Sequence, residues 1–121
     1  MDAKAPVCDE RQRFRIEDVV LADPAPDQVD IRTHYSGVSI GTQFALFRGK
    51  ISWGLYPICT GYMGTGSVSS IWSEVEGFDI GDEVYYRRNE SMELQDGTPV
   101  SCASGGHCSA VVANRDRVLQ I

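Results

Sequence analysis

The stretch that decides the fold covers residues 56–84 and reads YPICTGYMGTGSVSSIWSEVEGFDIGDEV. It begins with a glycine-rich run at residues 60–66, where the missing side chains let neighbouring backbones approach closely. Residues 66–72 then read as a strand, Gly81-Asp82 as a tight turn, and residues 83–87 as the next strand. This order predicts an antiparallel β-structure rather than a nucleotide-binding βαβ unit.

The flanking sequence extends this pattern in both directions. Residues 28–35 alternate, with Val29, Ile31, Thr33 and Tyr35 predicted on one face and Asp30, Arg32 and His34 on the other. Residues 37–50 are the best helical candidate, which Thr42 can cap and Gly49 can end. Further strands are predicted at 107–113 and 117–121, with a long polar loop at 89–104. The expected fold class is mainly β, with one or two short helices.

Length and composition favour one packed domain. The chain has 121 residues, of which 42% are hydrophobic and 23% charged. We expect residues 1–12 to be a flexible segment and residues 13–121 to form the domain. With no apolar run of about 18 residues and no apolar leader, we expect a soluble, cytoplasmic protein without a membrane partner. The net charge of −6 makes nucleic acid an unfavourable partner.

The four cysteines form neither a C-x-x-C pair nor a disulfide framework, so free thiols are expected. Cys102 and Cys108 with His107 fall short of a tetrahedral metal site unless Cys59 joins them. His107 and Cys108 are neighbours on a predicted strand and would face opposite sides, which disfavours a Cys-His dyad. His34 is predicted on the exposed face of its strand.

Five segments in one order resemble the GroES-like catalytic domain of the medium-chain dehydrogenase/reductase family, which includes the zinc alcohol dehydrogenases and quinone reductases. These segments are the proline-containing loop and strand at 23–32, SGVSIGTQ at 36–43, TGYMGTG at 60–66, EGFDIGDEV at 76–84 and the Gly-Gly-led strand at 105–112. The resemblance implies a partly open antiparallel β-barrel and an oxidoreductase that transfers hydride.

The residues at the zinc-binding positions of that family are replaced here. Ile40, or Ser39 if the alignment shifts by one residue, stands at the cysteine position, Tyr62 at the histidine and Met63 at the following glutamate. Because isoleucine cannot bind zinc and a neutral phenol is a poor ligand, we expect no metal and a zinc-independent reaction. NAD(P) is expected only if a nucleotide-binding domain is supplied elsewhere.

The resemblance also indicates site residues. Thr42 matches a proton-relaying hydroxyl and Tyr62 lies at the former metal position, so both are candidate catalytic groups; a helix cap and a volume-filling phenol are the respective alternatives. Candidate substrate-binding residues near the expected cleft are Gln43, Phe47, Arg48 and Trp53, with core packing as the alternative for the aromatic ones.

Two functions remain open from the sequence. The chain is either the substrate half of a zinc-independent NAD(P)-dependent oxidoreductase, acting on a small molecule beside a Rossmann-type domain, or a non-catalytic binding or assembly module from the same family. A barrel that packs against a nucleotide domain would expose an apolar face when alone. We therefore also expect self-association into a homo-oligomer.

Overall fold

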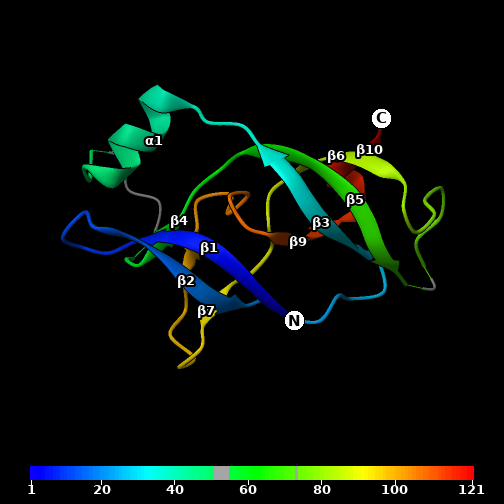
Figure 1. The fold of residues 1–121 in the computed structure, drawn as a ribbon, viewed down its shortest axis with the longest axis horizontal. Coiled ribbons are helices and arrows are strands. Elements are labelled where there is room, and N and C mark those ends of the chain that lie inside the picture. Colours follow the sequence, from blue (N-terminus) through cyan, green and yellow to red (C-terminus); the bar gives the residue numbers. More distant parts are fainter. Residues whose placement is uncertain (51–54, 73) are drawn as a thin grey trace.

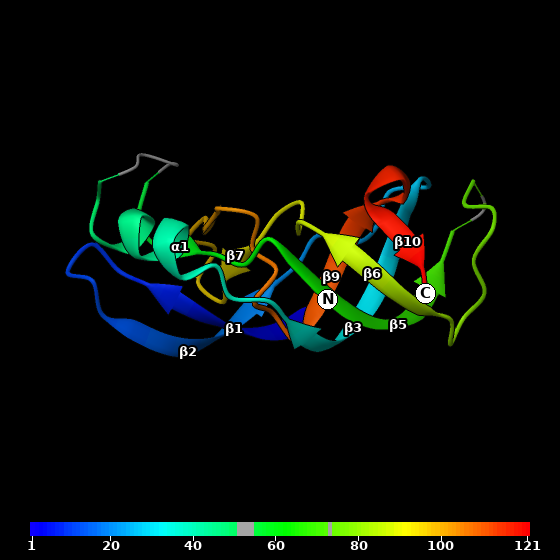
Figure 2. The ribbon, with the colours of Figure 1, turned by 90° about the horizontal axis from the view of Figure 1, so that it is seen from above.

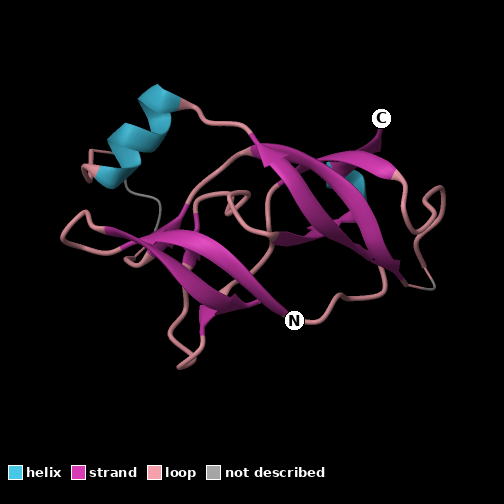
Figure 3. Ribbon diagram, in the orientation of Figure 1, coloured by secondary structure: helices cyan, strands magenta, loops and turns pink. Residues whose placement is uncertain are grey.

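Strands dominate the structure, a computed structural model that describes residues 1–50, 55–72 and 74–121 (Figure 1, Figure 3). The strands are β1 (Asp2–Cys8), β2 (Phe14–Val20), β3 (Gln28–Ser36), β4 (Ile58–Cys59), β5 (Met63–Ile71), β6 (Glu83–Arg87), β7 (Glu93–Leu94), β8 (Ser101–Cys102), β9 (Ala110–Asn114) and β10 (Val118–Gln120). One α-helix, α1 (Ile40–Phe47), and a 3₁₀ turn at Arg115–Arg117 complete the described elements.

The strands form two curled five-stranded sheets that lie side by side (Figure 2). The first sheet has the order β7-β2-β1-β4-β8, and the second has the order β10-β6-β5-β3-β9. All pairs are antiparallel except β4 with β8. This arrangement confirms the mainly β fold class and the partly open GroES-like barrel, with α1 beside the first sheet and the carboxyl terminus at the opposite end.

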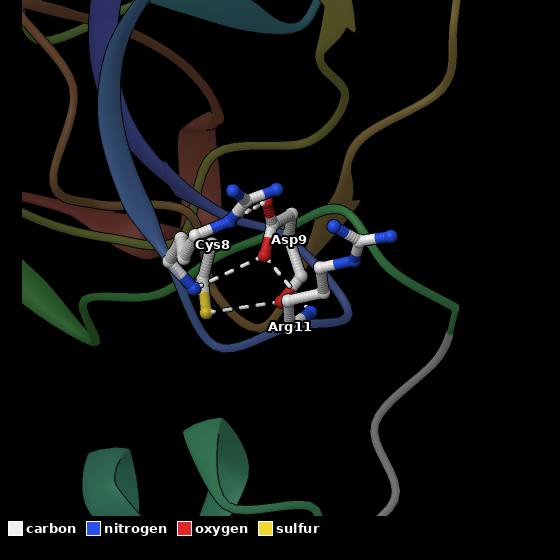
Figure 4. Close-up of polar contacts among 4 residues, drawn as sticks. Cys8, Asp9 and Arg11 are labelled. Carbon is white, nitrogen blue, oxygen red and sulfur yellow. Dashed lines mark hydrogen bonds and ion pairs between the residues drawn. The ribbon is translucent and has the colours of Figure 1, made fainter.

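The amino terminus differs from the flexible segment expected at residues 1–12. Asp2–Cys8 is a strand that pairs with β2 along its whole length, and its small side chains at Ala3 and Ala5 are buried. The Asp9 carboxylate accepts hydrogen bonds from the backbone N–H groups of Arg11 and Arg13 and so closes the hairpin (Figure 4). These bonds lower the pKa of the Asp9 carboxyl. Alanines carry little strand signal, which explains why the sequence pattern missed β1.

Strand β3 follows the prediction at its start and departs from it at its end. Val29 and Ile31 are buried, but the register with β5 shifts between Asp30 and Ile31 and again between Thr33 and Tyr35. These irregularities break the alternation, because an extra residue turns the following side chains over. As a result Tyr35 is 79% exposed. Asp30, which precedes both shifts, is also buried, and its carboxylate accepts a hydrogen bond from a serine hydroxyl on β5.

The helix lies inside the predicted 37–50 segment. Gly49 ends it as expected, with a φ of 70° and bonds from Gly49 N to Leu46 O and from Lys50 N to Ala45 O that form a Schellman motif. The helix begins after Ser39, however, so Thr42 lies within the first turn and the cap interpretation is wrong.

The segment predicted as a long polar loop at 89–104 contains two short strands. Strand β7 pairs with β2, and β8 pairs with β4, so this segment closes both edges of the first sheet. Strand β6 has the predicted bounds, whereas β9 begins at Ala110, three residues later than expected. His107 and Cys108 therefore lie in the loop before β9 and not on a strand.

Each sheet has its own apolar core, and a third cluster lies near α1. The first includes Val19, Leu21 and Met92, and the second includes Ile31, Val84 and Tyr86. The four cysteines are free thiols, as expected. Among the described residues, no helix has the length and apolar character to cross a membrane.

Candidate functional site

Two glycine-containing turns cross closely and fix the backbone of the site. Gly61 has a φ of 108°, and a side chain there would collide with the backbone of His107. Gly106 N donates to Gly61 O at 2.8 Å, and His107 N donates to Thr60 O at 3.0 Å. Because neither glycine leaves room for a side chain, the turn after β4 and the loop before β9 meet directly. This crossing brings Thr60 and His107 together.

Four polar side chains form one hydrogen-bonded series at this crossing, which we call the polar series. Ser36 Oγ lies 2.6 Å from His107 Nδ1, His107 Nε2 lies 3.0 Å from Gln43 Oε1, and Thr60 Oγ1 donates to the same Gln43 oxygen at 3.0 Å. The residues come from the end of β3, the loop before β9, α1 and the turn after β4. The three hydrogen bonds of the series join residues 17, 64 and 71 positions apart in the sequence.

The series determines which nitrogen of His107 carries the proton. The Gln43 carbonyl oxygen can only accept, so His107 Nε2 donates to it and Nδ1 is left to accept from the Ser36 hydroxyl. Burial lowers the pKa of His107 below its usual value, which favours the neutral ring. Gln43 is only 5% exposed, and its Nε2 has no partner among the described residues. The arrangement presents a basic nitrogen to a serine hydroxyl.

Two fully buried side chains hold the loop that carries His107. The Tyr86 hydroxyl donates to Gly106 O at 2.8 Å, and burial raises the pKa of this phenol to about 12. Asn89 Nδ2 lies 3.5 Å from Gly105 O, and Asn89 Oδ1 accepts from Val112 N at 3.2 Å. These contacts tie the loop to β6 and β9, so the position of His107 is set by the core of the second sheet.

Shallow hollows lie on two sides of Ser36. One, of about 370 Å³, is lined by Lys4, Pro6, Thr33, His34, Ser36, His107, Cys108 and Ser109. The other, of about 260 Å³, is mostly apolar and is lined by Tyr35, Ser36, Gly37, Met63, Gly64, Thr65 and Tyr85. Ser36 borders both hollows, but its side chain points to His107 on the inner face of β3, whereas Tyr35, Thr65 and Tyr85 line the second hollow on the opposite face.

The candidate residues from the sequence are dispersed. Gln43 belongs to the polar series, whereas Thr42 and Tyr62 are half-buried without a side-chain hydrogen bond among the described residues. The Phe47 ring packs edge-on against Phe14, with centroids 4.5 Å apart. Arg48 is exposed, with its guanidinium 5.5 Å from the centre of the Phe44 ring. Trp53 lies outside the described residues.

Sequence reasoning missed Ser36, Thr60 and His107. Their contacts span long sequence separations, and no spacing rule joins a strand end, a turn and a loop. The two glycine-containing stretches that cross were visible in the sequence, but their crossing was not. His34, in contrast, is exposed as expected, and its Nε2 lies 3.3 Å from Ser67 Oγ.

The positions that match zinc ligands do not carry a zinc-binding donor set. Gly37 N donates to Met63 O at 3.0 Å, so the loop before α1 and the start of β5 are adjacent, as a shared site would require. Ile40 has no donor atom, Met63 offers a thioether and Tyr62 a phenol. Nor do any three His, Cys, Asp or Glu side chains of the described residues gather as metal ligands. These residues do not fit zinc.

The glycine run does not fit a nucleotide either. Gly64 and Gly66 lie within β5, and side chains there would strike Tyr86 and the Arg32 carbonyl of the adjacent strand. A phosphate-binding turn instead exposes its backbone N–H groups at the start of a helix. The run lets neighbouring strands approach closely, as predicted, but from Met63 onward it is part of β5 and not a turn.

Comparison with known proteins agrees with this architecture. The family described as alcohol dehydrogenase GroES-like domain matches residues 25–121. Similar solved structures include an alcohol dehydrogenase zinc-binding domain protein from Burkholderia ambifaria, with a TM-score of 0.86, 15% identity and coverage of 100% of this chain and 42% of that one. The CAD protein from Helicobacter pylori complexed with NADP(H) has a TM-score of 0.81 and 17% identity, with coverage of 100% and 42%.

A quinone oxidoreductase from Coxiella burnetii is also similar, with a TM-score of 0.76, 19% identity and coverage of 99% of this chain and 37% of that one. At these identities the likeness establishes the fold. No curated protein sequence shows significant similarity to the chain. The chain spans well under half of the length of these three structural relatives.

Proposed function

Because the chain belongs to the alcohol dehydrogenase GroES-like domain family, we propose that it provides the substrate half of the cleft of a zinc-independent, NAD(P)-dependent oxidoreductase. The nucleotide would bind to a Rossmann-type domain outside the described residues, where NAD(P) supplies hydride transfer chemistry. The substrate would be a small carbonyl compound or the corresponding alcohol.

The observation that carries this proposal is the polar series beside positions where zinc donors have been replaced. Ile40 and Met63 lack the thiolate, imidazole and carboxylate donors that zinc prefers, while Ser36 at the end of β3 and His107 in the loop before β9 supply a hydroxyl and a basic nitrogen. An oxidoreductase without zinc needs a protein group to exchange the proton of the substrate oxygen. Thr42 and Tyr62 stay candidate substrate contacts, and Gln43 is a candidate that positions His107.

Ligand titrations followed by amide NMR test this proposal. Small aldehydes, ketones and quinones should shift the signals of residues 36–43, 60–63 and 106–108 saturably. NADPH should produce no saturable shift, because the described residues offer no phosphate-binding turn. Saturable NADPH binding by this chain alone would contradict the proposal that a separate domain binds the nucleotide. Carbonyl compounds that shift only the NMR signals of residues outside these segments would contradict the substrate role.

One observation favours the second candidate, a binding or assembly module without catalysis. The segment 35–44 exposes large apolar side chains, at Tyr35, Val38, Ile40 and Phe44. Such a concentration is typical of a surface that another domain or a second copy covers. Light scattering on the purified chain decides whether it self-associates. A monomer that binds no carbonyl compound and joins no nucleotide domain would count against both candidates.

A further inference from the structure

A further hollow, of about 420 Å³, lies at the end of the first sheet where the hairpin joins β1 to β2. Its lining comes from β1, the hairpin, β2, the segment before β4, and β7 with the turn that follows it. It shares no residue with the polar series or with the two hollows beside Ser36. A ligand there would therefore be bound independently of the site described above.

One wall of this hollow is apolar and is held in place by the fold. Val7 is 5% exposed and belongs to the first core, while Tyr56 and Leu94 are half-buried. The Tyr56 hydroxyl lies 3.4 Å from both Leu46 O and Phe47 O at the end of α1. Because the phenol is tied to the helix, its ring forms a fixed surface against which an apolar group can pack.

Two opposite charges without partners lie on β2 at the same hollow. Arg15 and Glu17 share one face of the strand, about 7 Å apart along it, and their register partners on β1 are buried in the first core. Neither forms an ion pair with a described residue, whereas Arg13 is paired with Asp9 at 3.2 Å. Glu10 lies in the hairpin, beyond that pair. The hollow thus offers one free guanidinium and one free carboxylate beside an apolar wall.

We propose that this hollow binds an α-amino acid with an apolar side chain. Arg15 binds the carboxylate and Glu17 binds the ammonium group, while the side chain packs against Val7, Tyr56 and Leu94. An amino acid carries both charges on one carbon atom, so a single ligand satisfies both groups of the strand. A simple anion or cation satisfies one group and leaves the other without a partner. This inference does not depend on the proposed oxidoreductase function.

Titrations of the 121-residue chain with L-phenylalanine, followed by amide NMR, test the site. The signals of Val7, Arg15, Tyr56 and Leu94 should shift together and saturably. Two matched ligands each lack one charge, since phenethylamine has no carboxylate and hydrocinnamate has no ammonium group. Each should bind about two- to fivefold more weakly, the range for loss of one solvent-exposed ion pair. Equal or tighter binding of either ligand in wild type would overturn the proposal.

Two variants assign the charges to their partners. Arg15→Gln should weaken the binding of L-phenylalanine about two- to fivefold and make it equal to that of phenethylamine, because the carboxylate no longer contributes. Glu17→Gln should weaken it by a similar factor and make it equal to that of hydrocinnamate. Arg32→Gln and Glu83→Gln are the matched controls, since these exposed charges lie on the second sheet, outside the hollow, and should leave binding unchanged.

The remaining outcomes are also decisive. No saturable shift with L-phenylalanine, shifts confined to the second sheet, or binding that neither variant weakens would overturn the proposal. The comparison of the three ligands uses wild type alone, so it decides the matter even if a substitution lowers stability. Loss of this site would leave the proposed oxidoreductase function as it stands, because carbonyl compounds are tested on the signals of residues 36–43, 60–63 and 106–108.

Discussion

Removing one oxygen atom from Tyr86 tests how the loop that carries His107 is held. The Tyr86 side chain is fully buried, and its hydroxyl donates to Gly106 O at 2.8 Å and lies 3.3 Å from Thr33 Oγ1. Tyr86→Phe keeps the ring and leaves the Gly106 carbonyl unpaired in the interior. The other partner, the Thr33 hydroxyl, is only half-buried and can form a hydrogen bond with water instead. We expect the free energy of unfolding to fall by about 1–3 kcal/mol, the cost of one orphaned buried acceptor.

Urea unfolding followed by circular dichroism measures this change. The midpoint should decrease while the slope with denaturant stays the same, because the ring and the surface exposed on unfolding are unchanged. Tyr85→Phe is the matched control, since that hydroxyl makes only an exposed contact with Met63 Sδ at 3.7 Å. Equal stability of Tyr86→Phe and wild type would refute the reasoning that this hydroxyl anchors the loop.

Alkaline pH gives an independent check on the same group. Burial raises the pKa of Tyr86 from 10.0 to about 12, so the folded state holds the phenolic proton more tightly than the unfolded state does. The stability of wild type should therefore fall as the pH rises from about 10 to about 12. Tyr86→Phe should lose this part of the pH dependence. If the stability of Tyr86→Phe falls between pH 10 and 12 as steeply as that of wild type, groups other than Tyr86 cause the alkaline loss of stability.

Three further changes have defined outcomes in the same unfolding assay. Gly66→Ala should destabilise the fold by about 3 kcal/mol or more, because the added methyl group would strike the Arg32 carbonyl of the adjacent strand. Gly41→Ala lies in open space within α1 and should instead raise the free energy of unfolding by about 0.5–1 kcal/mol. A lower free energy of unfolding would contradict a helical backbone at Gly41. Burial raises the pKa of Asp30, so wild-type stability should fall as pH rises above about 3.8, and Asp30→Asn should remove this fall.

The strands and turns with strong local signals could be predicted from the sequence. Strand β6 between Gly81-Asp82 and Arg87 and the end of α1 at Gly49 follow from turn chemistry and from the freedom of glycine to adopt positive φ. Strand β1 could not be predicted in this way, because two of its four buried positions are alanines, which alternate with charged residues at its start. Its pairing with β2 is a tertiary effect.

The site was less accessible to sequence reasoning than the fold. Tyr35 was assigned to the buried face, but the register shift in β3 between Thr33 and Tyr35 turns it to solvent, and no local pattern encodes such a shift. His107 was treated as a strand residue because the register of β9 is set by its pairing with β3. Of the residues proposed from the sequence, Gln43 joins the polar series, and its partners are found only when the glycine turns cross in space.

Zinc binding tests the central claim most directly. The claim is that Ile40, Tyr62 and Met63 have replaced a metal-binding set, and that Ser36 and His107 provide the proton chemistry. Native mass spectrometry and elemental analysis after incubation with Zn²⁺ and desalting should find no retained metal, and NMR signals of these residues should stay unchanged. Stoichiometric zinc that shifts the signals of Tyr62, Met63 and His107 would contradict the account.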